Sequence, residues 1–191
     1  QGSKYPNDTV ELIVSSLTEE DIQLLKAYFP DLKTLDATAC SDYAVLESAK
    51  QQLPGCEILY EVSLGGKSFA PDVTELTLEA GDYDYDTLME NLQYLPEVKK
   101  ITLRKPDMSL EQINELKTAF GNITFDCTVD IGGMEYTMDT TELDLSGISS
   151  DDVAGVSEKL GMLSGLTSVE LMKADGTSNL TKEDVKTLEE A

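Results

Sequence analysis

The sequence predicts an α/β fold built by repetition, in which a short strand followed by a helix recurs about six times in a mainly parallel array. Three observations lead to this prediction. The chain matches itself at a fixed offset, its expected helices share one start signal, and two segments turn at a Gly-Gly pair. Similarity at a fixed offset is typical of architectures in which stacked units bury a common core.

The internal match is strongest in the middle of the chain. Shifting the sequence against itself by 67 positions gives eight identities within residues 62–78, at Val62, Gly65, Gly66, Asp72, Thr74, Glu75, Leu76 and Leu78. Chance agreement over such a segment gives about one identity. Two copies of one module are therefore the economical explanation.

A shared helix start divides this module into smaller units. Thr18, Ser109 and Thr181 are each followed three residues later by Asp or Gln, close to the capping box that satisfies free amides at a helix N-terminus. Apolar residues at helical spacing follow and mark one buried face. Helices are expected at 18–29, 41–53, 85–95, 109–120, 150–163 and 181–190.

A short alternating run precedes each helix and predicts a strand. These runs are 12–14, 35–37, 76–78, 101–103, 143–145 and 169–171. Residues 56–70 and 123–137 each predict an inserted β-hairpin that turns at Gly-Gly, because glycine reaches positive φ without a steric penalty. The expected module is strand–helix–strand–helix–hairpin.

These modules set the expected boundaries of one continuous repeat domain. The first module covers 9–72, the second 73–139, and a partial third covers 140–191, so we expect the chain to stop inside a repeat. Residues 1–8 are expected as a flexible lead that begins with a tag remnant at Gln1-Gly2-Ser3.

The strand regions resemble leucine-rich repeats, whose pattern is L-x-x-L-x-L-x-x-N/C. Leu32, Leu35, Ala37 and Cys40 fit this pattern best, whereas the later strands keep the apolar spacing and lack the final Asn or Cys. Together with the Gly-Gly hairpins, these strands look like the divergent leucine-rich-repeat-like proteins exported by Gram-positive, often gut-dwelling, bacteria. The resemblance implies a secreted or cell-surface binding module and brings no catalytic residue; the sequence itself carries no signal peptide.

Residues that alternate with the apolar strand positions are expected on one outward sheet face. The candidate binding residues are Glu75, Thr77, Lys100, Thr102, Arg104, Glu142, Asp144 and Glu170. They predict a mainly acidic binding surface with a basic row at Lys100 and Arg104. The alternative is a set of ordinary solvated positions, because charged residues also protect sheets from aggregation.

Alternating carboxylates at Asp82, Asp84 and Asp86 are a weak candidate for a Ca²⁺ site. The EF-hand pattern fails here, because its sixth position is Thr87 and its twelfth is Gln93. Solvation and helix capping, with Asp86 as the N-cap, are the favoured interpretation. No other metal and no cofactor is expected.

The composition argues against several classes of function. With 14 basic and 37 acidic residues the net charge is −23, which disfavours nucleic-acid binding, and no stretch is apolar enough for membrane insertion. The chain has no histidine, which excludes triads and zinc sites built on imidazole. Its three cysteines, Cys40, Cys56 and Cys127, leave at least one free thiol and are expected as small buried hydrophobes of undetermined pairing.

The sequence therefore predicts a non-catalytic binding module for a protein or a glycan, outside the cell or at its surface. Tyr83, Tyr85 and Tyr94 could stack on a glycan, although helix packing explains them as well. A structural spacer within a larger surface protein is the alternative. A carboxylate-type hydrolase comes third, because it needs only two acids at a suitable separation, and the sequence does not indicate an oligomeric state.

Overall fold

The computed structural model describes residues 5–191, so the predicted tag remnant at Gln1-Gly2-Ser3 lies outside the described residues. The fold is mixed α/β, with strands and helices alternating along the chain and several small, mostly parallel sheets. The chain divides into two compact units, one made of residues 5–73 and 82–97 and the other of residues 74–81 and 98–191.

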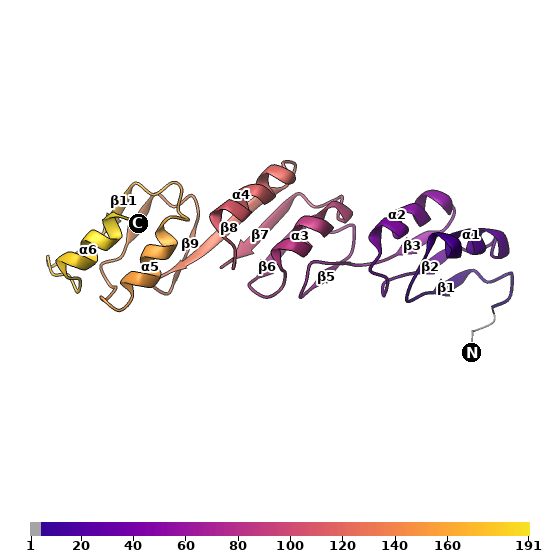
Figure 1. Cartoon of the computed structure of the whole chain (residues 1–191), viewed down its shortest axis with the longest axis horizontal. Helices are drawn as coiled ribbons and strands as arrows, with labels where there is room; N and C mark the ends of the chain where they lie inside the picture. The colour runs from indigo at the N-terminus through magenta and orange to yellow at the C-terminus, as the bar shows by residue number, and fades with distance from the viewer. Residues whose placement is uncertain (1–4) are drawn as a thin grey trace. The chain divides into compact units, whose positions relative to one another are not determined.

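The first unit begins with a parallel sheet of three strands, β1 (Glu11–Ile13), β2 (Thr34–Asp36) and β3 (Glu57–Leu59). Helices α1 (Glu19–Tyr28) and α2 (Tyr43–Gln52) connect the strands and lie along the same side of the sheet (Figure 1). This is the expected geometry of parallel strands, which need a crossover connection.

The core of this unit follows the predicted periodicities. Leu35 at the centre of β2 is fully buried, as are Ile22 of α1 and Leu46 of α2. Removing these side chains from water is the main contribution to the stability of the unit, at roughly 1.5–3 kcal/mol each.

A small hairpin completes the first unit. Its arms β4 (Val62–Ser63) and β5 (Ser68–Phe69) pair antiparallel around Gly65, whose φ is 119°. The hairpin predicted for 56–70 is therefore confirmed at its turn but shorter than expected, because residues 57–59 pair with β2 instead.

The first unit also contains helix α3 (Tyr85–Asn91), which comes later in the chain and continues into a 3₁₀ turn, Leu92–Tyr94.

The second unit contains a sheet in the order β6 (Glu75–Glu79), β7 (Lys100–Arg104), β8 (Thr124–Ile131) and β9 (Met134–Thr137). The first three strands are parallel, and β9 turns back antiparallel to β8. Gly132 and Gly133 form this turn at φ values of 61° and 84°, so the predicted Gly-Gly hairpin is confirmed, with its first arm also serving as the third parallel strand.

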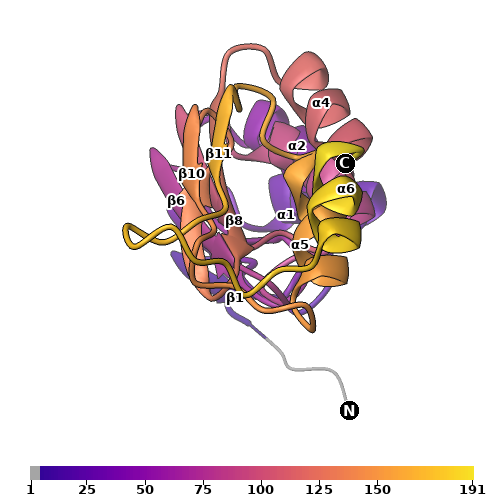
Figure 2. The ribbon, with the colours of Figure 1, turned by 90° about the vertical axis from the view of Figure 1, so that its left-hand side faces the viewer.

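The remaining strands of this unit, β10 (Glu142–Asp144) and β11 (Ser168–Glu170), form a separate parallel pair. Figure 2 shows β6, β8, β10 and β11 on one side of the unit, and α4 (Leu110–Ala119), α5 (Val153–Leu160) and α6 (Lys182–Glu189) on the other. The second unit thus has a strand layer and a helix layer.

All six predicted strands and all six predicted helices are present, within a few residues of the expected bounds. Their expected arrangement in one parallel array is wrong, because the strands are distributed over four sheets. In the second unit the physical reason is the hairpin, because β9 pairs antiparallel with β8 and occupies the edge where a further parallel strand would add.

The predicted capping boxes at α1, α4 and α6 are confirmed. In each, the hydroxyl of Thr18, Ser109 or Thr181 accepts a hydrogen bond from the backbone amide three residues later, and the side chain of that later residue accepts one from the N-cap amide.

All three cysteines are free; Cys40 and Cys127 are buried as expected, and Cys56 is half-buried. Within residues 5–191, no helix is long and apolar enough to cross a bilayer.

Candidate functional site

Five of the eight predicted surface residues share one face of the β6–β9 sheet. Glu75 and Thr77 of β6 lie opposite Lys100 and Thr102 of β7 in the parallel register, and Arg104 lies further along β7. The residues between them, such as Leu103, are buried. The period-two alternation therefore places these polar side chains together.

The basic row on this face is engaged in ion pairs. Arg104 bonds Glu79 of β6 at 3.2 Å and Glu135 of β9 at 2.5 Å, and Thr128 donates its hydroxyl to the same Glu135 at 2.6 Å. The hydrogen bond from Arg104 is the main reason why the pKa of Glu135 falls to about 2, and Glu135 in turn raises the pKa of Arg104.

Two lysines on the same side of the sheet are paired in the same way. Lys100 contacts Asp126 of β8 at 2.7 Å, and Lys105 contacts Asp130 of β8 at 2.8 Å. These partners lie on the hairpin strands, which the sequence did not assign to the same sheet. Lys100, Arg104 and Lys105 thus each form an ion pair with an acidic residue of the same unit.

The other three predicted residues lie on the second sheet of this unit. Glu142 and Asp144 belong to β10 and Glu170 to β11, and Asp144 faces Glu170 directly in the register. Hydrogen bonds from Ser146 hold the pKa of Asp144 below its ordinary value. In the described part of the chain, no Lys or Arg forms an ion pair with any of these three acids.

The three aspartates of the weak Ca²⁺ candidate lie in the first unit, and each has a role in the local structure there. Asp82 forms an ion pair with Lys67 at 2.5 Å. Asp84 caps α3 by accepting the amide and the hydroxyl of Thr87 at 2.8 and 2.7 Å, so the expectation that Asp86 is the N-cap is wrong. Asp86 lies in the first turn, where its charge suits the helix dipole. No cluster of three metal-ligating side chains occurs among residues 5–191.

The tyrosines considered for glycan stacking belong to the first unit. The Tyr94 ring packs against Tyr43 of α2, with ring centroids 5.2 Å apart and planes tilted by 44°. The Tyr43 hydroxyl also accepts the Ser63 amide at 2.8 Å. Packing within the unit therefore accounts for Tyr94.

A groove beside β11 is the feature that the sequence did not reveal. It lies between β11 and α6, has a volume of about 690 Å³, and is more apolar than polar in its lining. Its walls are Ser168, Val169, Glu170, Leu171, Met172, Ser178, Leu180, Thr181, Lys182 and Val185. Its size is in the range of ordinary ligand sites.

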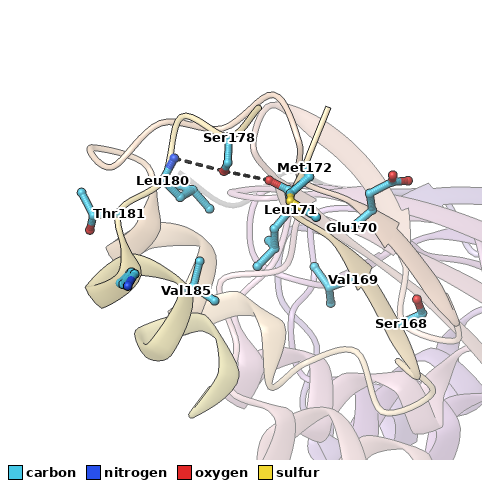
Figure 3. A pocket seen from close by; sticks show the side chains of 10 residues that line it. Ser168, Val169, Glu170, Leu171, Met172, Ser178, Leu180, Thr181 and Val185 are labelled. Atoms are coloured by element: carbon cyan, nitrogen blue, oxygen red, sulfur yellow. Dashed lines mark hydrogen bonds between the residues drawn. The ribbon is translucent and has the colours of Figure 1, made fainter. Parts of the chain in front are cut away.

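Figure 3 shows how the groove is lined. Val169 of β11 and Leu171, just after the strand, border the same space as Leu180 and Val185 on the helix side. Ser178 fixes the loop between them, because its hydroxyl donates to the Leu171 carbonyl at 2.9 Å and accepts the Leu180 amide at 3.2 Å. The groove is thus an apolar trough with a strand along one wall.

No signal in the sequence could distinguish these groove residues from core residues. Val169, Leu171 and Val185 have the same spacing as buried residues in other strand–helix units, and they are half-buried here. Comparison with protein-family models, curated proteins and solved structures gave no match.

Proposed function

We propose that the protein is a non-catalytic binding module, built of leucine-rich-repeat-like strand–helix units, that recognises a polypeptide through the groove between β11 and α6. The observation that carries the proposal is this apolar trough of about 690 Å³ beside a sheet edge. Exposed apolar grooves rimmed by polar residues are typical of interaction sites in soluble proteins.

The lining favours a polypeptide over a glycan. None of its ten residues is aromatic, whereas glycan binding through stacking needs aromatic rings. A strand edge offers a row of backbone donors and acceptors, which polypeptides match. Met172, with 58% of its surface exposed, provides a flexible apolar contact at the rim.

The strand–helix units support the repeat part of the proposal. At the start of β2, β7 and β11, two successive amides donate to one carbonyl, that of the residue just before the neighbouring strand. The pairs are Lys33 and Thr34 on Val10, Lys99 and Lys100 on Thr74, and Thr167 and Ser168 on Thr141. Identical connections at three places are expected from units of common construction.

The net charge of −23 and the resemblance to exported proteins support a location outside the cell or at its surface. The apolar lining of the groove supports the binding module over the spacer.

The test is a selection of displayed peptides and protein domains on the immobilised 191-residue chain, with a glycan array run in parallel. Selected polypeptides should bind the Val185→Asp and Met172→Asp variants at least about tenfold more weakly, because each contact removed is worth roughly 1.5–3 kcal/mol. Met172 is exposed, so its variant retains the fold if Val185→Asp does not.

Ile13→Asp is the matched control, because Ile13 is a 75% exposed apolar residue of β1 in the other unit. Polypeptides that bind all variants equally, or glycans that bind while polypeptides do not, would refute the proposal.

A further inference from the structure

The outward face of the first sheet combines acidic residues with exposed aliphatic ones. Its residues alternate with the buried Leu12, Leu35 and Ile58, so they point away from α1 and α2, which lie along the other side of the sheet (Figure 1). They are Glu11, Ile13, Thr34, Asp36, Glu57 and Leu59. None of these side chains is basic, so the face carries negative charge alone.

The register arranges these side chains in two rows across the three strands. The first row is Glu11, Thr34 and Glu57, and the second is Ile13, Asp36 and Leu59. Neighbouring strands lie about 4.8 Å apart, and alternate residues of one strand lie about 6.6 Å apart. Both rows are therefore within reach of one bound segment.

The acids of this face have no basic partner. In the part of the chain that the structure describes, no Lys or Arg forms an ion pair with Glu11, Asp36 or Glu57. Hydrogen bonds from the hydroxyl and the amide of Thr38, at 2.7 and 3.1 Å, hold the pKa of Asp36 below its ordinary value. Asp36 is therefore charged at neutral pH.

The corresponding face of the second unit supplies a cation at the equivalent place. The amides of Thr34 and Lys100 each donate to the carbonyl of the residue just before the neighbouring strand, at 3.0 and 3.3 Å. Lys100 lies opposite Glu75 in the register and pairs with Asp126 at 2.7 Å. The first sheet has Thr34 at this position, so its acids lack the internal cation that the second unit provides.

The aliphatic side chains beside Asp36 indicate what kind of cation fits. Ile13 is 75% exposed and Leu59 is 40% exposed, and they lie on the two strands that flank Asp36. Lys and Arg pack their aliphatic stems on apolar surface while the charged end remains free to meet a carboxylate. This row therefore matches both parts of a long basic side chain.

We propose that the outward face of the β1–β3 sheet binds an extended basic segment of a partner protein, with one Lys or Arg between Glu11 and Glu57 and a second beside Asp36. Residues i and i+2 of an extended segment have the same spacing as the two rows. The segment lies along β2, over the face of the sheet and not at its edge. This is a second binding surface, in the unit that does not contain the groove.

The probes are two peptides of equal charge, Thr-Arg-Thr-Arg-Thr (the spaced peptide) and Thr-Thr-Arg-Arg-Thr (the adjacent peptide). Both arginines face the sheet only in the spaced peptide, so it should bind the 191-residue chain about threefold or more tightly. NMR titration of the isotope-labelled chain measures both affinities, and the shifts should be largest around Thr34 and Asp36. Equal affinities of the two peptides would overturn the proposal.

Matched variants test whether the acids of this face carry the binding. Glu11→Gln combined with Glu57→Gln should weaken the spaced peptide about threefold or more and remove its advantage over the adjacent peptide. Glu20→Gln combined with Glu97→Gln removes the same charge from exposed positions of the same unit and should leave the advantage unchanged. Equal losses in the two double variants would show attraction to the net charge of −23 alone and would overturn the proposal.

A divalent cation and a second copy of the chain are the other occupants that the titrations distinguish. In a chain that binds neither peptide, Ca²⁺-induced shifts at the same residues, or a dimer in sedimentation velocity that Leu59→Asp disrupts, would overturn the proposal. Met172→Asp, in the groove, should leave the spaced peptide bound as before. If groove binding fails while the spaced peptide keeps its advantage, this inference stands without the proposed function, and the reverse result leaves only the groove.

Discussion

The Arg104 guanidinium donates to both carboxylate oxygens of Glu135, from Nε at 2.9 Å and from Nη2 at 2.5 Å. This bidentate pair connects β7 to β9 across β8, so it holds the returning arm of the hairpin against the sheet. Glu79 contributes a third contact from β6, at 3.2 Å. One side chain thus connects three strands on the face predicted for binding.

The stability of the second unit should depend on pH through Glu135. Its pKa falls from 4.5 to about 2 in the folded protein, so the stabilisation is complete above pH 4.5 and is lost as the pH falls toward 2. Glu135→Gln should lower the Tm at neutral pH and flatten its decline across this window. Melting curves between about pH 2 and 7 provide the measurement, and a wild-type decline that persists in the variant would contradict the prediction.

Asp84 should act as a helix cap and not as a calcium ligand. Asp84→Ala should cost about 1 kcal/mol of unfolding free energy, whereas Asp84→Ser should retain most of it, because serine also caps helices. Urea denaturation measures both variants. Addition of Ca²⁺ should leave the Tm of the wild type unchanged, and a rise that Asp84→Ala abolishes would show that the carboxylates bind the ion.

The two Gly-Gly turns should differ in their tolerance of a side chain. A Cβ at Gly65 would lie 2.9 Å from the Asp84 amide nitrogen and 3.0 Å from the Tyr83 Cα, at a φ of 119°. Gly65→Ala should therefore destabilise the protein by about 2–5 kcal/mol. Gly133→Ala meets nothing within 4 Å at a φ of 84° and should cost only about 1–2 kcal/mol. Equal costs in urea denaturation would contradict this difference.

Equivalent helix positions should respond unequally to truncation. Ile113 of α4 is fully buried, so Ile113→Ala should cost about 2–5 kcal/mol. Val185 of α6 is half-buried at the groove, so Val185→Ala should cost about 1 kcal/mol or less. Urea denaturation of the two variants provides the measurement, and a loss at Val185 as large as that at Ile113 would show that the two positions are equally packed.

The elements of the fold were predictable because their signals are local. The capping box at Thr18 and the Gly132-Gly133 turn each act through neighbouring residues. The pairing of strands is not local. Residues 57–59 alternate as a hairpin arm does, and the sequence cannot show that they join β2 in parallel, because both kinds of pairing have the same period.

The candidate site was predictable only in part, for the same reason. Alternation correctly grouped Glu75, Lys100 and Arg104 on one face, but their acidic partners lie on the hairpin strands. The groove was missed because an apolar residue such as Val169 has the same pattern whether or not a neighbouring strand covers it. Exposure at that position depends on whether another strand packs beside β11, and the periodicity of β11 itself carries no information about such a neighbour.

The turn at Gly132-Gly133 lets the chain cover an edge of its own sheet. Strand β9 pairs antiparallel with β8 and occupies the side on which a fourth parallel strand would add. The later strands β10 and β11 form a separate parallel pair. Because an unpaired strand edge is a template for association with other chains, this turn protects β8 from such pairing.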